Sequence, residues 1–329
     1  MKRQEQPLIG ESPAFLNMLE QVSRAALLNR PVLVVGERGT GKELIAERLH
    51  YLSSRWDQPL VKLNCAAISS ALLESELFGH EAGAFTDASR RRIGRFEQAG
   101  EGTLFLDELA TTSQAVQEKI LRIIEYGEFE RLGSSTTQSV DVRVVGATNE
   151  DLPSLAAVGK FRADLLDRLS FDVITLPPLR ERLEDIEPLA EHFAIRMSRE
   201  LGRELFAGFS SKAMRQMLEY TWPGNVRELK NVVERAVYRL EKIEGPITVL
   251  ELDPFDSPWR PRTASELAAN PEPGVLRNDL RTWLDEQERL LVERAISECG
   301  GNRKRAAERL GLTYDQLRGI LRKHQNDPE

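Results

Sequence analysis

One stretch of the chain combines glycines and a lysine at a spacing that suits a phosphate group. It consists of Gly36, Glu37, Arg38, Gly39, Thr40, Gly41, Lys42 and Glu43. The spacing G-x-x-x-x-G-K lets backbone N–H groups turn inward around phosphate oxygens, while the lysine reaches the terminal phosphates. Glu43 stands where this motif has the Ser or Thr that contacts Mg²⁺, so the metal needs other ligands.

The segments on either side of this stretch decide whether it is a phosphate-binding loop or an ordinary glycine-rich turn. The apolar, β-branched run 31–35 precedes it and predicts a buried strand. The helical run 43–52 follows, and its N-terminus adds partial positive charge. A strand before the loop and a helix after it are the context the motif requires, which favours the phosphate-binding interpretation.

A second stretch, 103–108, is an apolar strand that ends in Asp107 and Glu108. After a phosphate-binding loop, the first acid is expected to hold Mg²⁺ and the second to activate water for attack on the γ-phosphate of ATP. Asn64 and Asn149 end two further strands. Asn149 is suited to hold the attacking water or sense the γ-phosphate, and Asn64 to hydrogen-bond Glu108. The alternative for both is an asparagine that only shapes a turn.

Three arginines are further candidates. An arginine supplied by a neighbouring subunit neutralises charge on the γ-phosphate, and Arg162 and Arg168 flank a short helix. On spacing alone, local ion pairs with Asp164 and Asp167 are the favoured explanation. Arg227 lies near a helix start, the wrong end for a positive charge, which indicates either a partner anion or a plain surface arginine.

Strands and helices alternate over the first half of the chain. Strands are predicted at 32–35, 60–63, 103–106, 142–147 and 171–176, and a first helix within 8–30, with Ser12 as N-cap and Pro13 at the first helical position. This alternation predicts an α/β fold with a parallel five-stranded sheet and helices on both faces. We expect an α/β domain at 1–176, a small helical domain at 177–250, a proline-rich linker at 251–280 and a terminal helical domain at 281–329.

Composition narrows the class of protein. The 329 residues are 41% hydrophobic, as in globular proteins, and no apolar run approaches the ~20 residues of a membrane span. The N-terminus has no secretory signal, and the two distant cysteines, Cys65 and Cys299, argue against a disulfide framework. We therefore expect a cytoplasmic protein.

The last helices carry an excess of positive charge. Residues 303–323 hold seven basic and two acidic residues, a net charge of +5 in a chain of net charge −7. A Gly311-Leu-Thr turn between two amphipathic runs predicts a helix-turn-helix, with a helical oligomerisation hairpin as the alternative. The expected DNA contacts are Lys304, Arg305, Thr313, Tyr314, Asp315, Gln316, Arg318, Arg322 and Lys323.

Taken in order, the motifs GERGTGKE, ELFGHEAGAFTDA, GTLFLDE, ATN, FRADLLDRL, PLRER and WPGNVRELKN resemble the bacterial enhancer-binding proteins. These are AAA+ ATPases that activate transcription by σ54-RNA polymerase. The resemblance implies an ATPase domain with a helical lid, a Fis-type helix-turn-helix, an ATP-binding ring, most often a hexamer, and enhancer DNA as partner. It also implies that Asn64 is a glutamate switch, Arg162 and Arg168 are trans-acting arginine fingers, and Arg227 is a second sensor.

The loop that contacts σ54 in this family departs from its usual pattern, G-A-F-T-G-A. Here it consists of Gly83, Ala84, Phe85, Thr86, Asp87 and Ala88. The expected contact residues Phe85 and Thr86 are kept, whereas Asp87 replaces a glycine and adds negative charge at the tip. Hydrolysis is expected to survive this change, but coupling to σ54 is left open.

Within the family, the chain is most similar to the phage-shock activators. It starts directly at the ATPase region, an arrangement that goes with control by a separate inhibitor protein of the PspA type. Trp56 lies in a polar stretch and is either an exposed docking point for that inhibitor or a half-buried tryptophan on the sheet edge.

Two alternatives to a σ54-dependent activator stay open at this point. One is a DNA-binding regulator of σ70 promoters whose σ54 loop has degenerated, which Asp87 favours. The other is an AAA+ ATPase that remodels a different protein, against which the retained Phe85-Thr86 pair and the basic last helix argue.

Overall fold

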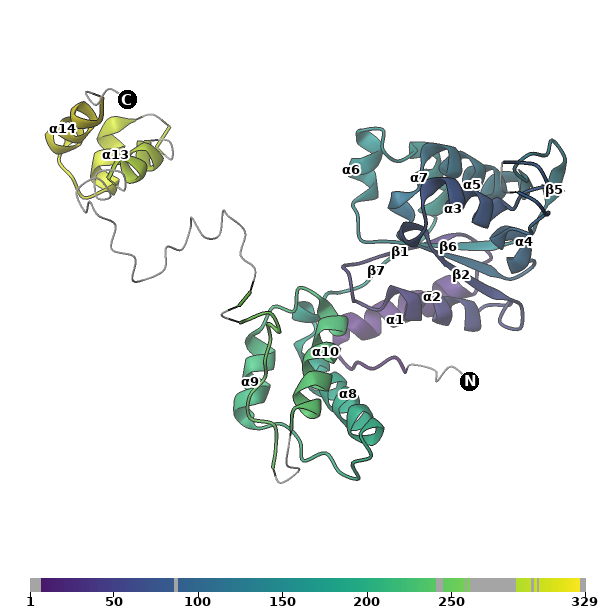
Figure 1. Ribbon diagram of the computed structural model, residues 1–329, viewed down its shortest axis with the longest axis horizontal. Coiled ribbons are helices and arrows are strands. Elements are labelled where there is room, and N and C mark those ends of the chain that lie inside the picture. Colours follow the sequence, from purple (N-terminus) through teal and green to yellow (C-terminus); the bar gives the residue numbers. More distant parts are fainter. Residues whose placement is uncertain are drawn as a thin grey trace. The chain divides into compact units, whose positions relative to one another are not determined.

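A computed structural model describes residues 7–85, 88–240, 245–257, 259–260, 288–296, 299–300 and 302–325 (Figure 1). The chain divides into two compact units, Met1–Pro254 and Phe255–Glu329. Each unit has its own hydrophobic core, so each is described by itself.

The first unit is built on a parallel five-stranded sheet, as the alternating pattern predicts. Its strands lie in the order β2 (Leu60–Asn64), β3 (Thr103–Asp107), β6 (Arg143–Thr148), β1 (Val32–Val35) and β7 (Val173–Thr175). All four neighbouring pairs are parallel, with Asn64 beside Asp107 and Val35 beside Thr148. The carboxyl ends of β1, β3 and β6 therefore meet at one central edge, where ligands bind in such folds.

Helices cover both faces of this sheet (Figure 1). On one face lie α1 (Pro13–Ala26) and α2 (Lys42–Tyr51), which pack Phe15, Val22 and Leu49 onto the sheet. On the other lie α3 (Ser70–Phe78), α4 (Arg95–Ala99), α5 (Gln114–Tyr126), α6 (Leu152–Ala157) and α7 (Ala163–Leu169). Apolar side chains from both faces are buried against the strands, which fixes the positions of the strand ends.

The first helix is shorter than the predicted 8–30. It begins at Pro13, with Ser12 as N-cap, as predicted, and ends at Ala26. The residues before it are held in another way, because the backbone N–H groups of Glu11 and Ser12 donate to the carboxylate of Asp185.

A two-stranded hairpin, β4 (Glu128–Glu130) with β5 (Thr137–Ser139), was not predicted. Each strand is three residues long and mostly polar, so neither shows a hydrophobic periodicity. The hairpin follows α5 directly, and Phe129 is its buried anchor.

The lid is the helical part of the first unit. It contains the short 3₁₀ helices η3 (Leu179–Glu181) and η4 (Leu183–Asp185), then α8 (Ile186–Glu200), α9 (Ser211–Glu219) and α10 (Asn225–Tyr238). The helices share one core around Trp222, which is fully buried. Ile247 and Leu250 close this core from the chain that follows.

The second unit contains a helix at 288–296, followed by α13 (Arg303–Arg309) and α14 (Tyr314–Gln325). Ala306, Ala307 and Leu317 are buried in its core, and Leu310, Ile320 and Leu321 are partly buried against it. Gly311 makes the turn with φ +66°. The predicted linker lies largely outside the described residues, at 261–280.

Candidate functional site

The loop between β1 and α2 has the conformation of a phosphate cradle. Gly39 and Gly41 have φ of +79° and +102°, which side chains other than glycine rarely adopt. A Cβ at Gly39 would also collide with the carbonyl of Gly224. Gly41 is the N-cap of α2 and has no side-chain cap, so the helix N-terminus is open to an anion.

Lys42 is buried below this loop. Its Nζ donates to the carbonyl oxygens of Gly36, at 2.8 Å, and Glu37, at 3.2 Å. Burial lowers the pKa of Lys42, while the nearby carboxylates of Glu108 and Asp107 oppose that shift. The lysine is therefore held between the loop and the two acids at the end of β3.

Glu108 has a left-handed backbone, with φ +53°, which is uncommon for a residue with a side chain. Strained backbone of this kind gathers at functional sites. With its amide nitrogen turned toward Glu108, Asn149 donates to both carboxylate oxygens, at 2.5 and 3.2 Å.

The other strand-end asparagine is placed differently from the sequence-based expectation. Asn64 Nδ2 donates to Asp107 Oδ2 at 3.0 Å, and its Oδ1 accepts from the backbone N–H groups of Ala66 and Ala67. The expected hydrogen bond from Asn64 to Glu108 is thus replaced by one to Asp107, because Asn64 and Asp107 are paired in register on β2 and β3. Asn149 takes the place beside Glu108.

The loop, the two acids and the lid enclose a cleft of about 570 Å³. Arg38, Lys42, Glu43, Asn64, Asp107 and Glu108 line it from the α/β side, and Val226, Arg227 and Lys230 of α10 line it from the lid. The backbone N–H of Arg227 donates to the Gly39 carbonyl at 3.3 Å, which places its exposed side chain at the cleft. One cleft thus brings together Arg227 and the motif residues.

Sequence inspection missed a second connection between loop and lid. The guanidinium of Arg180 donates to both oxygens of Glu37, at 2.7 and 2.9 Å. Fully buried Asn225 donates to Glu37 Oε2 and to the Arg38 carbonyl, and accepts from the backbone N–H of Leu179. The hydrogen bond from Arg180, then that from Asn225, lowers the pKa of Glu37 to about 2, so this carboxylate stays charged.

Arg162 and Arg168 do not line the cleft. Arg162 donates to both oxygens of Asp164, at 3.0 and 2.7 Å, which is the local ion pair that the sequence predicts. Arg168 pairs with Glu125 at 2.7 Å rather than with Asp167. Arg162 is the N-cap of α7 and its side chain is 30% exposed, whereas Arg168 lies in the last turn of α7 and its side chain is 61% exposed.

Glu43 and Asp107 are the acids near the motif that bear on a metal ion. Glu43 forms an ion pair with Lys62, whose Nζ lies 2.9 Å from the Glu43 carboxylate. Among the described residues, no group of three or more His, Cys, Asp or Glu side chains is placed to hold a metal. Carboxylates next to a phosphate cradle, without a full protein cage, fit Mg²⁺ that shares its shell with phosphates and water.

The segment between α3 and α4 carries Gly83, Ala84, Phe85 and Ala88; Thr86 and Asp87 lie outside the described residues. Gly83, with φ +84°, donates its N–H to the Ala88 carbonyl at 2.7 Å and closes the loop. Phe85 is 41% exposed and rests edge-on against the ring of His80. An exposed aromatic at a closed loop tip suits contact with a partner protein.

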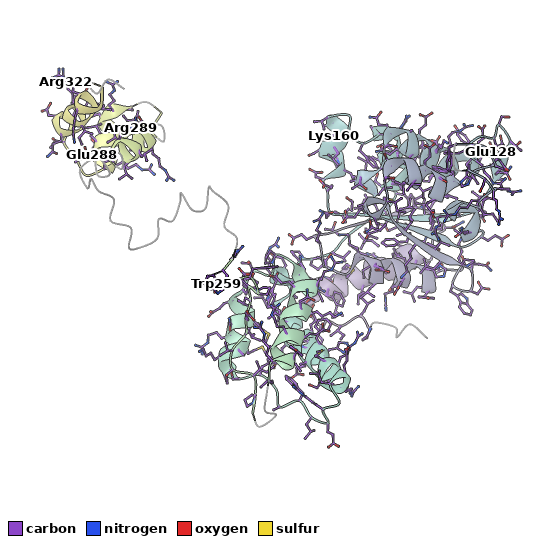
Figure 2. The ribbon with its side chains drawn as sticks, in the orientation of Figure 1. Glu128, Lys160, Trp259, Glu288, Arg289 and Arg322 are labelled. Carbon is purple, nitrogen blue, oxygen red and sulfur yellow. The ribbon has the colours of Figure 1, made fainter. Side chains whose placement is uncertain are left out.

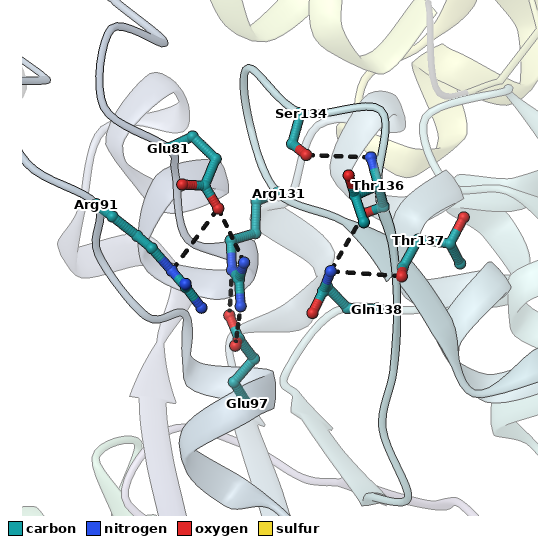
Figure 3. Close-up of polar contacts among 8 residues, drawn as sticks. All are labelled: Glu81, Arg91, Glu97, Arg131, Ser134, Thr136, Thr137 and Gln138. Atoms are coloured by element: carbon teal, nitrogen blue, oxygen red, sulfur yellow. Dashed lines mark hydrogen bonds and ion pairs between the residues drawn. The ribbon is translucent and has the colours of Figure 1, made fainter.

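A buried arginine fixes the base of this segment (Figure 3). Arg131, which follows the hairpin strand β4, donates to Glu97 Oε1 at 2.8 Å and to Glu81 Oε1 at 2.9 Å. Arg91 lies 3.7 Å from the same oxygen of Glu81. The Arg131 hydrogen bond lowers the pKa of Glu97. The loop is thereby connected to α4 and to the hairpin by charged groups that stay charged.

Trp56 is 63% exposed in the turn after α2, which agrees with an exposed docking point and not with a half-buried tryptophan. The turn itself is held by Arg55, which is buried and donates to Asn29 Oδ1 and to the Asp141 carbonyl. Trp56 is therefore presented on a rigid support.

All the predicted DNA-contact residues are exposed on α13, α14 or the turn between them. Figure 2 shows Arg322 at the outer surface of this unit. The side chains of Thr313 and Gln316 already make hydrogen bonds within the protein. Thr313 Oγ1 accepts from the Gln316 N–H, and Gln316 Oε1 accepts from the Thr313 N–H. Arg303, absent from the predicted set, lies beside Tyr314, Arg318 and Arg322 around a small hollow of about 140 Å³.

Three family profiles match the chain. They are the Sigma-54 interaction domain at residues 8–175, the AAA+ ATPase lid domain at 180–261, and the Fis family of bacterial regulatory proteins at 284–324. In the described part of the chain, no helix is long and apolar enough to cross a membrane.

Curated relatives match over most of the chain. The chain is 57% identical to the Psp operon transcriptional activator of Escherichia coli over 97% of its own length and 98% of that protein. It is 46% identical to the Nif-specific regulatory protein of Azotobacter vinelandii over 95% of its length but only 58% of that protein. Crystal structures of NtrX from Brucella abortus with ADP and with ATP align at TM-score 0.70 and 33% identity, covering 97% and 96% of this chain and 70% and 69% of NtrX.

Proposed function

The chain belongs to the σ54-dependent transcriptional activators, AAA+ ATPases with a Fis-type DNA-binding domain, and from this premise we propose how its residues carry out the activity. The observation that supports the proposal most directly is the cleft in which the glycine-rich loop, Asp107, Glu108 and Arg227 meet.

ATP occupies this cleft with its phosphates on the loop 36–43 and the N-terminus of α2. Lys42 exchanges its contacts with the loop carbonyls for the β- and γ-phosphates. Asp107 holds Mg²⁺, which neutralises charge on the phosphates when it is bound. Glu108 accepts a proton from the attacking water, and Asn149, bound to its carboxylate, keeps it in place or releases it according to the γ-phosphate.

The remaining site residues act between copies of the chain and between lid and loop. Arg162 and Arg168 reach the cleft of a neighbouring subunit in a ring of six copies, the pattern of the family, by giving up Asp164 and Glu125. Arg227 reports the nucleotide state to the lid through α10. Asn64, the last residue of β2, holds the carboxylate of Asp107 in the orientation in which it would bind Mg²⁺.

Hydrolysis then moves the loop 83–88 against σ54 and promotes opening of the promoter. Phe85, with Thr86, makes the contact, and Asp87 alters its charge. The second unit binds enhancer DNA through α14, with Arg303 added to the predicted phosphate contacts.

The relative named for the Psp operon supports a phage-shock role for this chain. We assign to Trp56 the docking of an inhibitor of the PspA type, because it is an exposed tryptophan on a rigid turn. DNA and RNA polymerase as partners support a cytoplasmic location for the protein.

The test is open-complex formation by σ54-RNA polymerase on a σ54 promoter, with the purified full chain and ATP. It compares wild type with Asp87→Gly, which restores the family loop, and with Lys42→Ala, which disables the cradle. We expect wild type and Asp87→Gly to open the promoter and Lys42→Ala to fail in both opening and hydrolysis.

The other outcomes separate the alternatives. If only Asp87→Gly opens the promoter while both proteins hydrolyse ATP, the ATPase assignment stands and the chain is a weakened or redirected activator. If neither opens it despite hydrolysis, the protein regulates σ70 promoters or remodels another partner. Enhancer binding unchanged by Arg318→Ala would contradict the assignment of α14 to DNA.

A further inference from the structure

Arg182, in the lid, is a buried arginine whose hydrogen-bonding capacity is almost unused. Its side chain is 3% exposed, and no hydrogen bond to it is formed by any described residue. Its Nη1 lies 3.8 Å from Asp185 Oδ2, and its guanidinium lies over the ring of Phe15, 5.0 Å from the centroid. A guanidinium has five N–H donors, and leaving them unpaired in the interior is costly.

The carboxylate nearest to Arg182 is already engaged elsewhere. Asp185 is fully buried and accepts from the N–H groups of Glu11 and Ser12 with Oδ1, and from the Ser12 hydroxyl with Oδ2. These bonds join the lid to the start of α1. Asp185 thus balances the charge of Arg182 without satisfying its donors.

Arg182 lines the same cleft as the phosphate-binding loop. Leu8, Ile9, Phe15, Leu176, Leu189 and Phe193 form apolar walls of this cleft, which His192 and Arg196 also line. An apolar wall suits a flat aromatic base and not a phosphate group, and the phosphates have their own place at Lys42 and the α2 N-terminus.

We infer that Arg182 recognises the purine base of the nucleotide, by donating a hydrogen bond to a ring nitrogen that faces it. This rests on the proposed placement of the phosphates on the loop 36–43. The base supplies the acceptor that the protein lacks, and a base without a nitrogen at that position leaves the buried donor unpaired and binds more weakly. Arg182 belongs to the lid, and its guanidinium packs on Phe15 of α1. A base bound to Arg182 therefore helps to hold the lid against α1 and the sheet.

The test is calorimetric binding of ADP, of 1-deaza-, 3-deaza- and 7-deaza-ADP, and of tripolyphosphate, which has no base, to the full chain. The variants are Arg182→Lys, which keeps the charge beside Asp185, and Arg182→Met, which keeps the apolar stem. Arg199→Gln is the matched control, an exposed arginine on α8 outside the cleft. Lys42→Ala tests the placement of the phosphates independently.

We expect wild type to bind one of the three deaza nucleotides about tenfold more weakly than ADP, the effect of one hydrogen bond to a charged group. Arg182→Lys and Arg182→Met should bind ADP about tenfold more weakly than wild type, no longer distinguish that analogue from ADP, and bind tripolyphosphate as wild type does.

Three results would overturn the inference. They are equal binding of ADP and all three deaza analogues by wild type, unchanged ADP binding by both Arg182 variants, and a parallel loss of ADP and tripolyphosphate, which indicates a damaged lid. Lys42→Ala should lose both ligands. If it binds both normally, the phosphates lie elsewhere and the proposed site fails together with the inference.

Discussion

At the scale of single residues, the two strand-end asparagines contact different acids, and the contact with Glu108 that the sequence predicts for Asn64 is made by Asn149. Asn64 contacts Asp107, the acid proposed to hold Mg²⁺, and Asn149 contacts Glu108, the acid proposed to activate water. A hydrogen bond to a carboxylate fixes its orientation. Changes at the two asparagines should therefore have different kinetic signatures.

We predict that Asn149→Ala lowers kcat for ATP hydrolysis on the order of tenfold, since a charge-assisted hydrogen bond is worth about 1.5–3 kcal/mol, and leaves the Mg²⁺ dependence unchanged. Asn64→Ala should instead raise the Mg²⁺ concentration that gives half-maximal rate. Steady-state phosphate release across a Mg²⁺ titration measures both. The reversed pattern would show that Asn64, not Asn149, governs Glu108.

At the scale of elements, the position of the loop 83–88 depends on the hairpin of β4 and β5, which is distant from it in sequence. Arg131 of the hairpin connects Glu81, at the base of the loop, with Glu97 on α4 (Figure 3). The hairpin turn is ordered by its own polar contacts, among them the Thr136 N–H to Ser134 Oγ at 3.1 Å. A small, mostly polar element thus fixes the position of a functional loop.

We predict that Arg131→Met destabilises the full chain by about 2–3 kcal/mol, because it leaves two carboxylates without their buried partner. Hydrogen exchange at residues 79–85 should become faster, while the cleft still binds ADP. Urea denaturation and exchange mass spectrometry measure these effects. Arg122→Met, an exposed arginine on α5, is the control and should change neither.

The ion pair of Arg131 with Glu97 makes the free energy of unfolding depend on pH. Arg131 lowers the pKa of Glu97 below its ordinary value of 4.5, so the folded state holds this carboxylate charged more firmly than the unfolded state does. The stabilisation is complete above pH 4.5 and is lost as the pH falls below it. The difference in unfolding free energy between wild type and Arg131→Met should therefore be constant from pH 7 to 5 and shrink in more acid solution. A difference that grows with acid would contradict the pairing.

The sequence predicts the five strands and the phosphate-binding loop because both are set by neighbours along the chain. The loop needs glycines within six positions, and each strand contains consecutive apolar residues. The contacts that were missed join distant residues: Asn225 to Glu37 spans 188 positions, and Arg180 to Glu37 spans 143. Periodicity and spacing carry no information on such pairs, so Arg131, Arg180, Arg182 and Asn225 stand out only in the folded chain.

At the scale of the whole molecule, we propose that a second copy of the chain completes the cleft. Arg38 and Arg227 line the chain's own cleft, but Arg162 and Arg168, the arginines proposed to neutralise charge on the γ-phosphate, do not. Both are at the surface, in ion pairs with Asp164 and Glu125 that a neighbour's phosphates can replace. A head-to-tail contact between copies, which closes into a ring, would supply them.

This arrangement predicts complementation between two inactive variants. Lys42→Ala has no working cradle but keeps its arginines, and the double variant Arg162→Ala/Arg168→Ala has the cradle but no arginines. Each alone should hydrolyse ATP at least 100-fold more slowly than wild type, by analogy with other trans-acting arginines. Mixed in equal amounts, they should recover activity, because in a randomly mixed ring about a quarter of head-to-tail interfaces join a working cradle to a working arginine. Phosphate release by the mixture measures the recovery, with each variant mixed with itself as the control. If the arginines act within their own subunit, no interface combines both functions and the mixture stays as inactive as its components.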